Sequence, residues 1–216
     1  MQALSIFFIL NCFLSCKSKR EINERNTLQN TIIKEVEKPK LDLNKTKKKA
    51  AEALEFCKRK KMNTDFCIMI DMSLHSGVDR FVVWDFKANK IKTKHLVGHG
   101  CGNNKWSSDE SKESPTFSNE DGSHLSSLGK YKLSDRGHSD WGINVKYLMH
   151  GLDETNSNAI NRFIVFHSWN LTSDNEVFPN GSPEGWGCPT ISNNTMREID
   201  PVIQKSENPV LMWIYN

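Results

Sequence analysis

The stretch from Arg162 to Ser192 constrains the fold and the chemistry of this chain more than any other. It opens with the apolar run 163–166, ends that run at His167, and continues through a polar, turn-rich loop. Short apolar runs bounded by turn residues are typical of buried strands. The stretch closes on Gly-Trp-Gly-Cys-Pro-Thr-Ile-Ser, with Cys188 between a glycine and a proline. This order indicates a candidate base and a candidate nucleophile.

His167 and Cys188 have the chemistry that nucleophilic catalysis requires. The thiolate is the reactive form of cysteine, and a neighbouring imidazole can take its proton. Gly187 removes side-chain bulk beside the sulfur, and the backbone N–H groups of Gly187 and Cys188 are candidates for an oxyanion hole. A free cysteine is, however, often a buried and inert small hydrophobic residue. The spacing of the pair leaves both interpretations open.

Further runs, spread from about Phe66 to Tyr215, surround this pair in the sequence. They are CIMIDMS, RFVVWDF, VGHG, FSN, GSHLSSLGKY and GLDETNSNA. Together with the Trp-Gly-Cys-Pro run they resemble the YkuD-like murein L,D-transpeptidases of bacterial cell walls. The resemblance implies a mostly β, sandwich-like single catalytic domain with short helices and an N-terminal helical lead-in.

The resemblance also implies a role for each site residue. Cys188 would attack a peptide carbonyl, and His167 would act as general base and then as general acid. The main-chain carbonyl of Ser168 would hold the imidazole in orientation. The residues expected on the oxyanion and substrate side are Gly187, Trp186, His99 and Ser127.

The implied reaction is cross-linking of peptidoglycan stem peptides. Cys188 would form a thioester with release of a D-amino acid, and an amine of a second stem would resolve it, without a metal or an organic cofactor. Carbapenem-type inhibitors would acylate the same thiol. Two alternatives remain: an L,D-carboxypeptidase or endopeptidase with water as acceptor, and a non-catalytic cell-wall-binding lipoprotein in which Cys188 is structural or bridged to Cys101.

Two positions depart from the pattern of the wider superfamily. Gly185 stands where most members have Ser or Thr, so one hydroxyl is missing. Pro189-Thr190 replaces the usual aliphatic-Arg pair, so a cation on the substrate side is missing too. Both departures leave the nucleophile intact and bear on the choice of substrate.

The N-terminus predicts export. Residues 3–14 are apolar but too short to span a bilayer, which is typical of a signal-peptide core. Leu-Ser-Cys at 14–16 resembles a bacterial lipobox, so residues 1–16 would be the leader and Cys16 the lipid anchor of a protein facing the periplasm or cell envelope. A cleaved, unlipidated signal peptide and a secreted protein are the alternative.

The distribution of charged residues along the chain distinguishes a basic tether from the domain that follows it. Residues 17–61 hold 15 of the 29 Lys and Arg but only 7 of the 26 Asp and Glu. Residues 17–43 therefore predict a flexible charged tether. Because the basic charge lies outside the part that carries the motifs, nucleic-acid binding is not expected. Residues 44–61 predict a helical lead-in capped by Asn44, and residues 62–216 the catalytic domain.

The remaining cysteines and polar residues yield structural expectations. If any disulfide forms, Cys57 and Cys67 are its expected partners, because they are close in sequence and export permits oxidation. The His99-Gly-Cys run fits no standard zinc spacing, so no metal site is expected. Asp71 and Arg80 are expected as a surface pair or as loop braces, and residues 105–120 as an exposed polar loop.

Overall fold

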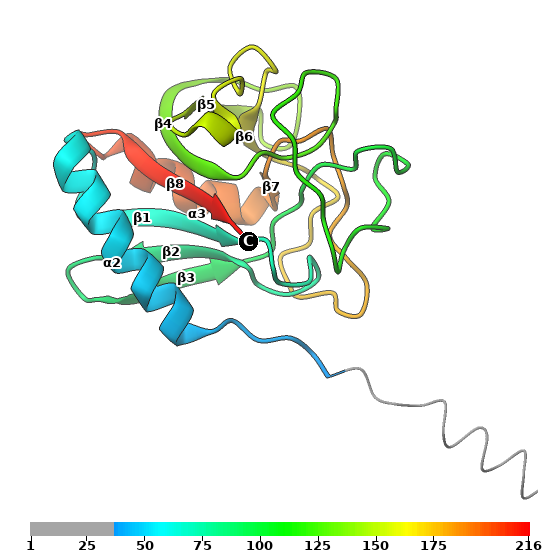
Figure 1. Cartoon of the computed structure of the whole chain (residues 1–216), viewed down its shortest axis with the longest axis horizontal. Helices are drawn as coiled ribbons and strands as arrows, with labels where there is room; N and C mark the ends of the chain where they lie inside the picture. The colour runs from blue at the N-terminus through cyan, green and yellow to red at the C-terminus, as the bar shows by residue number, and fades with distance from the viewer. Residues whose placement is uncertain (1–36) are drawn as a thin grey trace, which may run out of the picture. The chain divides into compact units, whose positions relative to one another are not determined.

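An eight-stranded sheet organises residues 37–216, the part of the chain that this computed structural model describes (Figure 1). In chain order the elements are α2 (Leu43–Lys60), β1 (Phe66–Asp71), β2 (Phe81–Asp85), β3 (Lys90–His95), β4 (Gly129–His138), β5 (Val145–Gly151), the 3-10 turn η1 (Glu154–Asn156), β6 (Val165–Ser168), β7 (Thr190–Ile191), α3 (Asn193–Gln204) and β8 (Val210–Tyr215). The mostly β fold with short helices is thereby confirmed. The predicted leader with Cys16, and the predicted tether up to residue 36, lie outside the described residues.

The C-terminal strand lies in the middle of the sheet. The strand order is β3-β2-β1-β8-β4-β5-β6-β7, so β8 joins the first three strands to the last four. It pairs in parallel with β1 and antiparallel with β4. The sheet also nearly closes on itself, because Gly98, just after β3, donates its N–H to the carbonyl of Thr190 in β7 at 2.8 Å.

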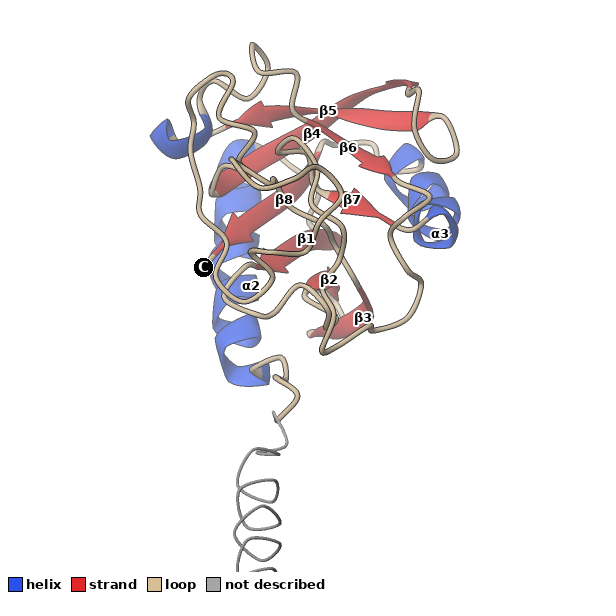
Figure 2. Ribbon diagram, turned by 90° about the vertical axis from the view of Figure 1, so that its right-hand side faces the viewer, coloured by secondary structure: helices blue, strands red, loops and turns tan. Residues whose placement is uncertain are grey.

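The helices cover opposite faces of the central strands, as Figure 2 shows. Alternate residues of a strand point to opposite faces. In β1, Ile68 packs into the core that contains Ile199 of α3, whereas Met69 packs with Ala53 of α2. All six residues of β1 and all six of β8 are buried. Burial on both faces explains why these strands are continuous apolar runs.

Helix α2 begins slightly earlier than the sequence predicts. Its N-cap is Asp42 rather than Asn44: the Asp42 carboxylate accepts hydrogen bonds from the N–H groups of Asn44 and Lys45. The helix ends at Lys60, where Lys61 adopts a left-handed conformation with φ 54°. No helix within residues 37–216 is both long and apolar enough to cross a membrane.

The disulfide expected between Cys57 and Cys67 is not formed. Cys57 of α2 and Cys67 of β1 are both free and buried in the layer between helix and sheet. Burial raises the pKa of Cys57 to about 12 and that of Cys67 well above its ordinary value. Both thiols therefore remain protonated and act as small hydrophobic residues.

Asp71 and Arg80 do not form the expected surface pair, because both are buried. The Asp71 carboxylate binds the ammonium of Lys45 in α2 at 3.0 Å, which ties the helix to the end of β1. Arg80 is fully buried and donates to the carbonyls of Leu74 and Val97. Its guanidinium thereby joins two loops, as the alternative expectation of a loop brace requires.

Candidate active site

Strands β5, β6 and β7 bring His167 and Cys188 to one pocket. His167 lies opposite Thr190 in the parallel β6–β7 ladder, and Cys188 precedes Thr190 by two residues. The N–H of Val165 in β6 donates to the Cys188 sulfur at 3.4 Å. The pairing of two short strands therefore places the thiol beside the histidine.

The hydrogen bonds of His167 determine which ring nitrogen is available. Nδ1 lies 2.9 Å from the main-chain oxygen of Ser168. A carbonyl only accepts, so Nδ1 carries the proton and Nε2 of the neutral ring has a free lone pair. Burial lowers the pKa of His167, although the bond to Ser168 opposes this in part. The imidazole is therefore neutral at pH 7 and able to take a proton.

The cysteine and the histidine form a neutral pair in the resting site. Burial raises the pKa of the Cys188 thiol, and the N–H of Val165 only partly offsets this. Among residues 37–216 the thiol contacts the N–H of Val165 and, at 3.8 Å, the carbonyl of Phe163, and forms no hydrogen bond with His167. Burial thus outweighs the neighbouring positive charges of Arg162 and Lys146, and the resting thiol stays protonated.

Backbone donors for an oxyanion are present beside the sulfur. The N–H groups of Gly187 and Cys188 donate no hydrogen bond to the described part of the chain. The carbonyl of Gly187 accepts from Ser126 Oγ at 2.9 Å, and Ser126 Oγ in turn accepts from the N–H of Gly100 at 3.1 Å. These bonds fix the peptide between Gly187 and Cys188, and with it the orientation of the Cys188 N–H, as a preorganised oxyanion hole requires.

Tryptophans that sequence reasoning missed form a wall of the pocket. Trp106, Trp141 and Trp169 line it and pack together, with ring centroids 5.1 to 6.2 Å apart. Trp106 comes from residues 105–120, which the sequence predicts as an exposed polar loop. A tryptophan in a polar loop is the sequence signal that could have indicated it.

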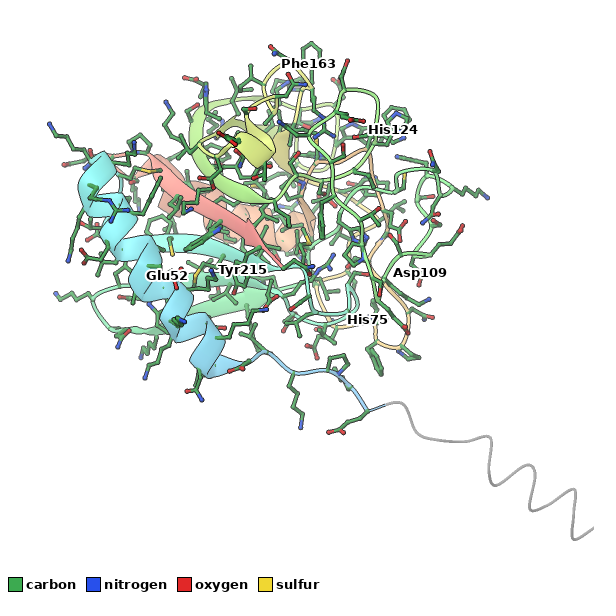
Figure 3. The ribbon with its side chains drawn as sticks, in the orientation of Figure 1. Glu52, His75, Asp109, His124, Phe163 and Tyr215 are labelled. Carbon is green, nitrogen blue, oxygen red and sulfur yellow. The ribbon has the colours of Figure 1, made fainter. Side chains whose placement is uncertain are left out.

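Trp186 lines the same pocket and is 62% exposed. Its ring stacks on His124 at 5.4 Å. Phe163 is 84% exposed and has φ 54°, which is unusual for a bulky residue. Figure 3 shows His124 and Phe163 on loops away from Glu52 of helix α2. Of the residues expected on the substrate side, Trp186 lines the pocket, and Gly187 directly precedes Cys188 in the chain.

His99 does not reach the pocket, because it is buried in a chain of hydrogen bonds. Arg80 can only donate, so its Nη2 donates to His99 Nδ1 at 2.9 Å. His99 Nε2 must then donate to Ser111 Oγ at 2.9 Å, and Ser111 Oγ donates to the buried carboxylate of Glu184 at 2.9 Å. Burial and the charge of Arg80 lower the pKa of His99. His99 therefore anchors the segment before Cys188 and does not face substrate.

Ser127 is likewise a structural residue and does not line the pocket. Its hydroxyl donates to the carbonyl of Ser118 at 2.7 Å and accepts from Arg162 at 2.6 Å. Arg162 also donates to the carbonyl of Leu125 at 2.6 Å. These contacts hold residues 118–127 against Arg162, which precedes strand β6. Within residues 37–216 no three His, Cys, Asp or Glu side chains gather as metal ligands would.

The model of one protein family matches nearly all of the described chain. It is the YkuD_2 family, the L,D-transpeptidase catalytic domain, and it matches residues 37–215. The chain belongs to this family. No curated protein matches the chain. Because the match begins at residue 37, helix α2 is part of the L,D-transpeptidase domain.

Solved structures that match part of the chain come from several bacteria. The helical cell shape determining protein Pgp2 from Campylobacter jejuni is 12% identical, with a TM-score of 0.43 over 70% of this chain and 47% of that chain. Bd1075 from Bdellovibrio bacteriovorus is 14% identical, with a TM-score of 0.40 over 72% and 49%. An L,D-transpeptidase from Xylanimonas cellulosilytica is 11% identical, with a TM-score of 0.38 over 69% and 60%. The chain matches less than half of the length of the first two proteins.

Replacing Gly187 with Ala is expected to destabilise the L,D-transpeptidase domain. Gly187 has φ +103°, and an added Cβ would lie 2.7 Å from the carbonyl oxygen of Leu125. Backbone strain and this clash should lower the free energy of unfolding by about 2 kcal/mol or more. Gly185→Ala is the matched control, because nothing lies within 4 Å of a Cβ there. Equal urea midpoints for the two variants would contradict the prediction.

Lowering the pH is expected to reduce the free energy of unfolding of the domain already at pH values above those at which its carboxylates titrate. Burial lowers the pKa of His75, His99 and His167 below the unfolded value of about 6.5. Between the two pKa values the unfolded chain binds more protons, so the free energy of unfolding rises with pH in that window. It should therefore fall as the pH drops below about 6.5. Urea midpoints measured between pH 7.5 and 5.5 test this prediction. A midpoint that does not change with pH would refute it, and so would a pH dependence that is the same in His99→Gln as in the wild type.

Proposed function

We propose that this protein is a cysteine-dependent L,D-transpeptidase that cross-links peptidoglycan stem peptides. His167 Nε2 takes the thiol proton as Cys188 Sγ attacks the carbonyl carbon that precedes the leaving D-amino acid. The N–H groups of Gly187 and Cys188 stabilise the oxyanion. The C–N bond then breaks, and His167 gives its proton to the departing amine. The product of this half-reaction is a thioester on Cys188.

The second half-reaction reverses these roles. The amine of a second stem attacks the thioester, and His167 takes a proton from that amine. The C–S bond breaks, an amide cross-link forms, and the sulfur leaves with the proton held by His167. Every proton passes through one ring nitrogen, and the reaction as proposed calls on no metal or organic cofactor.

The observation that carries this proposal is the tautomer of His167 beside Cys188. With Nδ1–H held by the carbonyl of Ser168, Nε2 is the available base in a pocket shared with the thiol. A neutral pair suits a nucleophile that is activated as substrate binds. Carbapenem-type inhibitors, whose strained carbonyl would use the same donors, are proposed to acylate Cys188.

A water acceptor would convert the same site into an L,D-carboxypeptidase or endopeptidase. The tryptophan wall favours an amine acceptor, because apolar rings beside the thioester reduce the access of water. The non-catalytic alternative with Cys188 bridged to Cys101 has less support, since both thiols are free. Membrane anchoring at Cys16, facing the periplasm or cell envelope, completes the proposal.

Mass spectrometry of muropeptides incubated with the protein tests the proposed reaction. Disaccharide tetrapeptides should yield dimers cross-linked between two diamino acids, together with one free D-amino acid per link. Tripeptides without dimers would show that water is the acceptor. An unchanged mixture would refute the proposed function.

A further inference from the structure

The leaving D-amino acid of the proposed reaction ends in a carboxylate, yet the pocket itself offers no permanent cation. Its lining consists of four tryptophans, Gly185, Cys188, Thr190 and His167. Burial keeps His167 neutral by lowering its pKa, and it is also committed to proton transfer. A carboxylate brought against such a wall loses hydration and requires a charged partner.

We propose that Lys146 of strand β5 binds this carboxylate and thereby selects donors with a free C-terminus. Lys146 lies directly opposite His167 in the antiparallel β5–β6 ladder, and His167 lies opposite Thr190 in the β6–β7 ladder. Directly paired residues share a face of the sheet, with Cβ atoms about 5 Å apart. Lys146, His167 and Thr190 therefore form a row on one face, with the lysine beside the catalytic histidine.

The charge of Lys146 reaches both members of the catalytic pair. It lowers the pKa of His167 and opposes the burial that raises the pKa of Cys188. Arg162 is the other cation that acts on the thiol. Its two terminal nitrogens, however, already donate four hydrogen bonds within residues 118–127.

Lys146 is, by contrast, free to take a ligand. Within residues 37–216 its ammonium forms no ion pair and no hydrogen bond, although many other lysines of the domain do. Its alkyl chain leans over Gly137 of β4, with Cε 3.7 Å from the place of a Cβ there, and so lies on the side of β5 away from His167. Because no contact holds the ammonium over β4, the side chain is free to turn toward β6, where an anionic ligand in the pocket would bind it.

The row of Lys146, His167 and Thr190 also offers a substitute for the arginine that is usual in the superfamily and that Thr190 replaces here. The position two residues after Cys188, Thr190, holds no charge, but Lys146 stands in the same row two strands away. The cation would thus be supplied by β5 instead of β7. This step rests on the proposed function, because the carboxylate belongs to its leaving group.

Two donor peptides that differ only at the C-terminus test the proposal through turnover. One tetrapeptide donor ends in a free carboxylate and the other in a carboxamide. Lys146→Met should lower kcat/KM for the carboxylate donor by about 10- to 100-fold, the effect of losing one charge-assisted hydrogen bond. The kcat/KM of the carboxamide donor should change less than about three-fold, because its uncharged end forms no ion pair.

Lys132→Met on β4 is the matched control and should leave kcat/KM unchanged for both donors. Equal losses for both donors in Lys146→Met would overturn the proposal.

Alkylation of Cys188 tests the same site without any peptidoglycan. Iodoacetate is anionic and iodoacetamide is neutral, so their rate ratio reports the positive charge near the thiol. A change in thiol pKa alters both rates equally and cancels in the ratio.

The ratio of the iodoacetate rate to the iodoacetamide rate, followed by peptide mapping at Cys188, should fall in Lys146→Met and not in Lys132→Met. An unchanged ratio overturns the proposal whether or not the protein turns over peptides. A lowered ratio without turnover of any donor supports the anion site and refutes the proposed function instead.

Discussion

Cys188→Ala is expected to abolish turnover, with a loss of at least about 1,000-fold in the release of the D-amino acid. The variant retains the pocket, the tryptophan wall and the base, but it cannot form the thioester. Carbapenem adducts should disappear from the intact mass for the same reason. Cys188 is only partly buried at the edge of the core, so the free energy of unfolding should change by no more than about 1–2 kcal/mol.

The matched control for this variant is Cys101→Ala. Cys101 is a free thiol with a pKa raised by burial, and its sulfur contacts the carbonyl of Gly102 rather than the catalytic pair. Its replacement should leave the carbapenem adduct in place. An adduct that survives Cys188→Ala, or that depends on Cys101, would show that the nucleophile is a different residue.

His167→Ala is expected to lower kcat/KM by about 100- to 10,000-fold, the range typical of losing a general base. The wild-type rate should fall in acid only below about pH 6.5, because burial lowers the pKa of His167 from its ordinary value. Protonation of Nε2 removes the lone pair that accepts the thiol proton. The rate therefore rises with pH through this depressed pKa.

The pH profile distinguishes a base from a merely structural histidine. His167→Ala should lose the acidic limb as well as the rate, whereas His138→Ala, at an exposed position of β4, should retain both. Stopped-flow or initial-rate measurements between pH 4.5 and 8 provide the comparison. A variant that is slow but keeps the wild-type acidic limb would mean that another group is the base.

The sequence predicts the site best where neighbouring residues determine the geometry. A strand that ends at His167-Ser168 places the ring next to the carbonyl that orients it, within two consecutive residues. Gly187 needs a left-handed φ, which the glycine itself indicates. The short apolar runs likewise predict most of the strands, and their continuous burial in β1 and β8 explains the lack of alternation.

The residues that were misplaced depend on contacts between distant segments. His99 and Ser127 were expected at the substrate, but Arg80 and Arg162 bind them and draw them into structural networks. No periodicity encodes that pairing, since each partner lies on a different loop. The position of Lys146 follows from the register of β5 on β6, which a single sequence does not reveal.

The central place of β8 has a consequence for how the proposed catalytic pair can be disturbed from a distance. Strand β8 pairs with β1 on one side and with β4 on the other, so it joins strands β1–β3, which His99 follows, to strands β4–β7, which position His167 and Cys188. A substitution that loosens β8 should therefore shift the two parts of the sheet against each other and misalign the thiol and the base, although it touches neither residue.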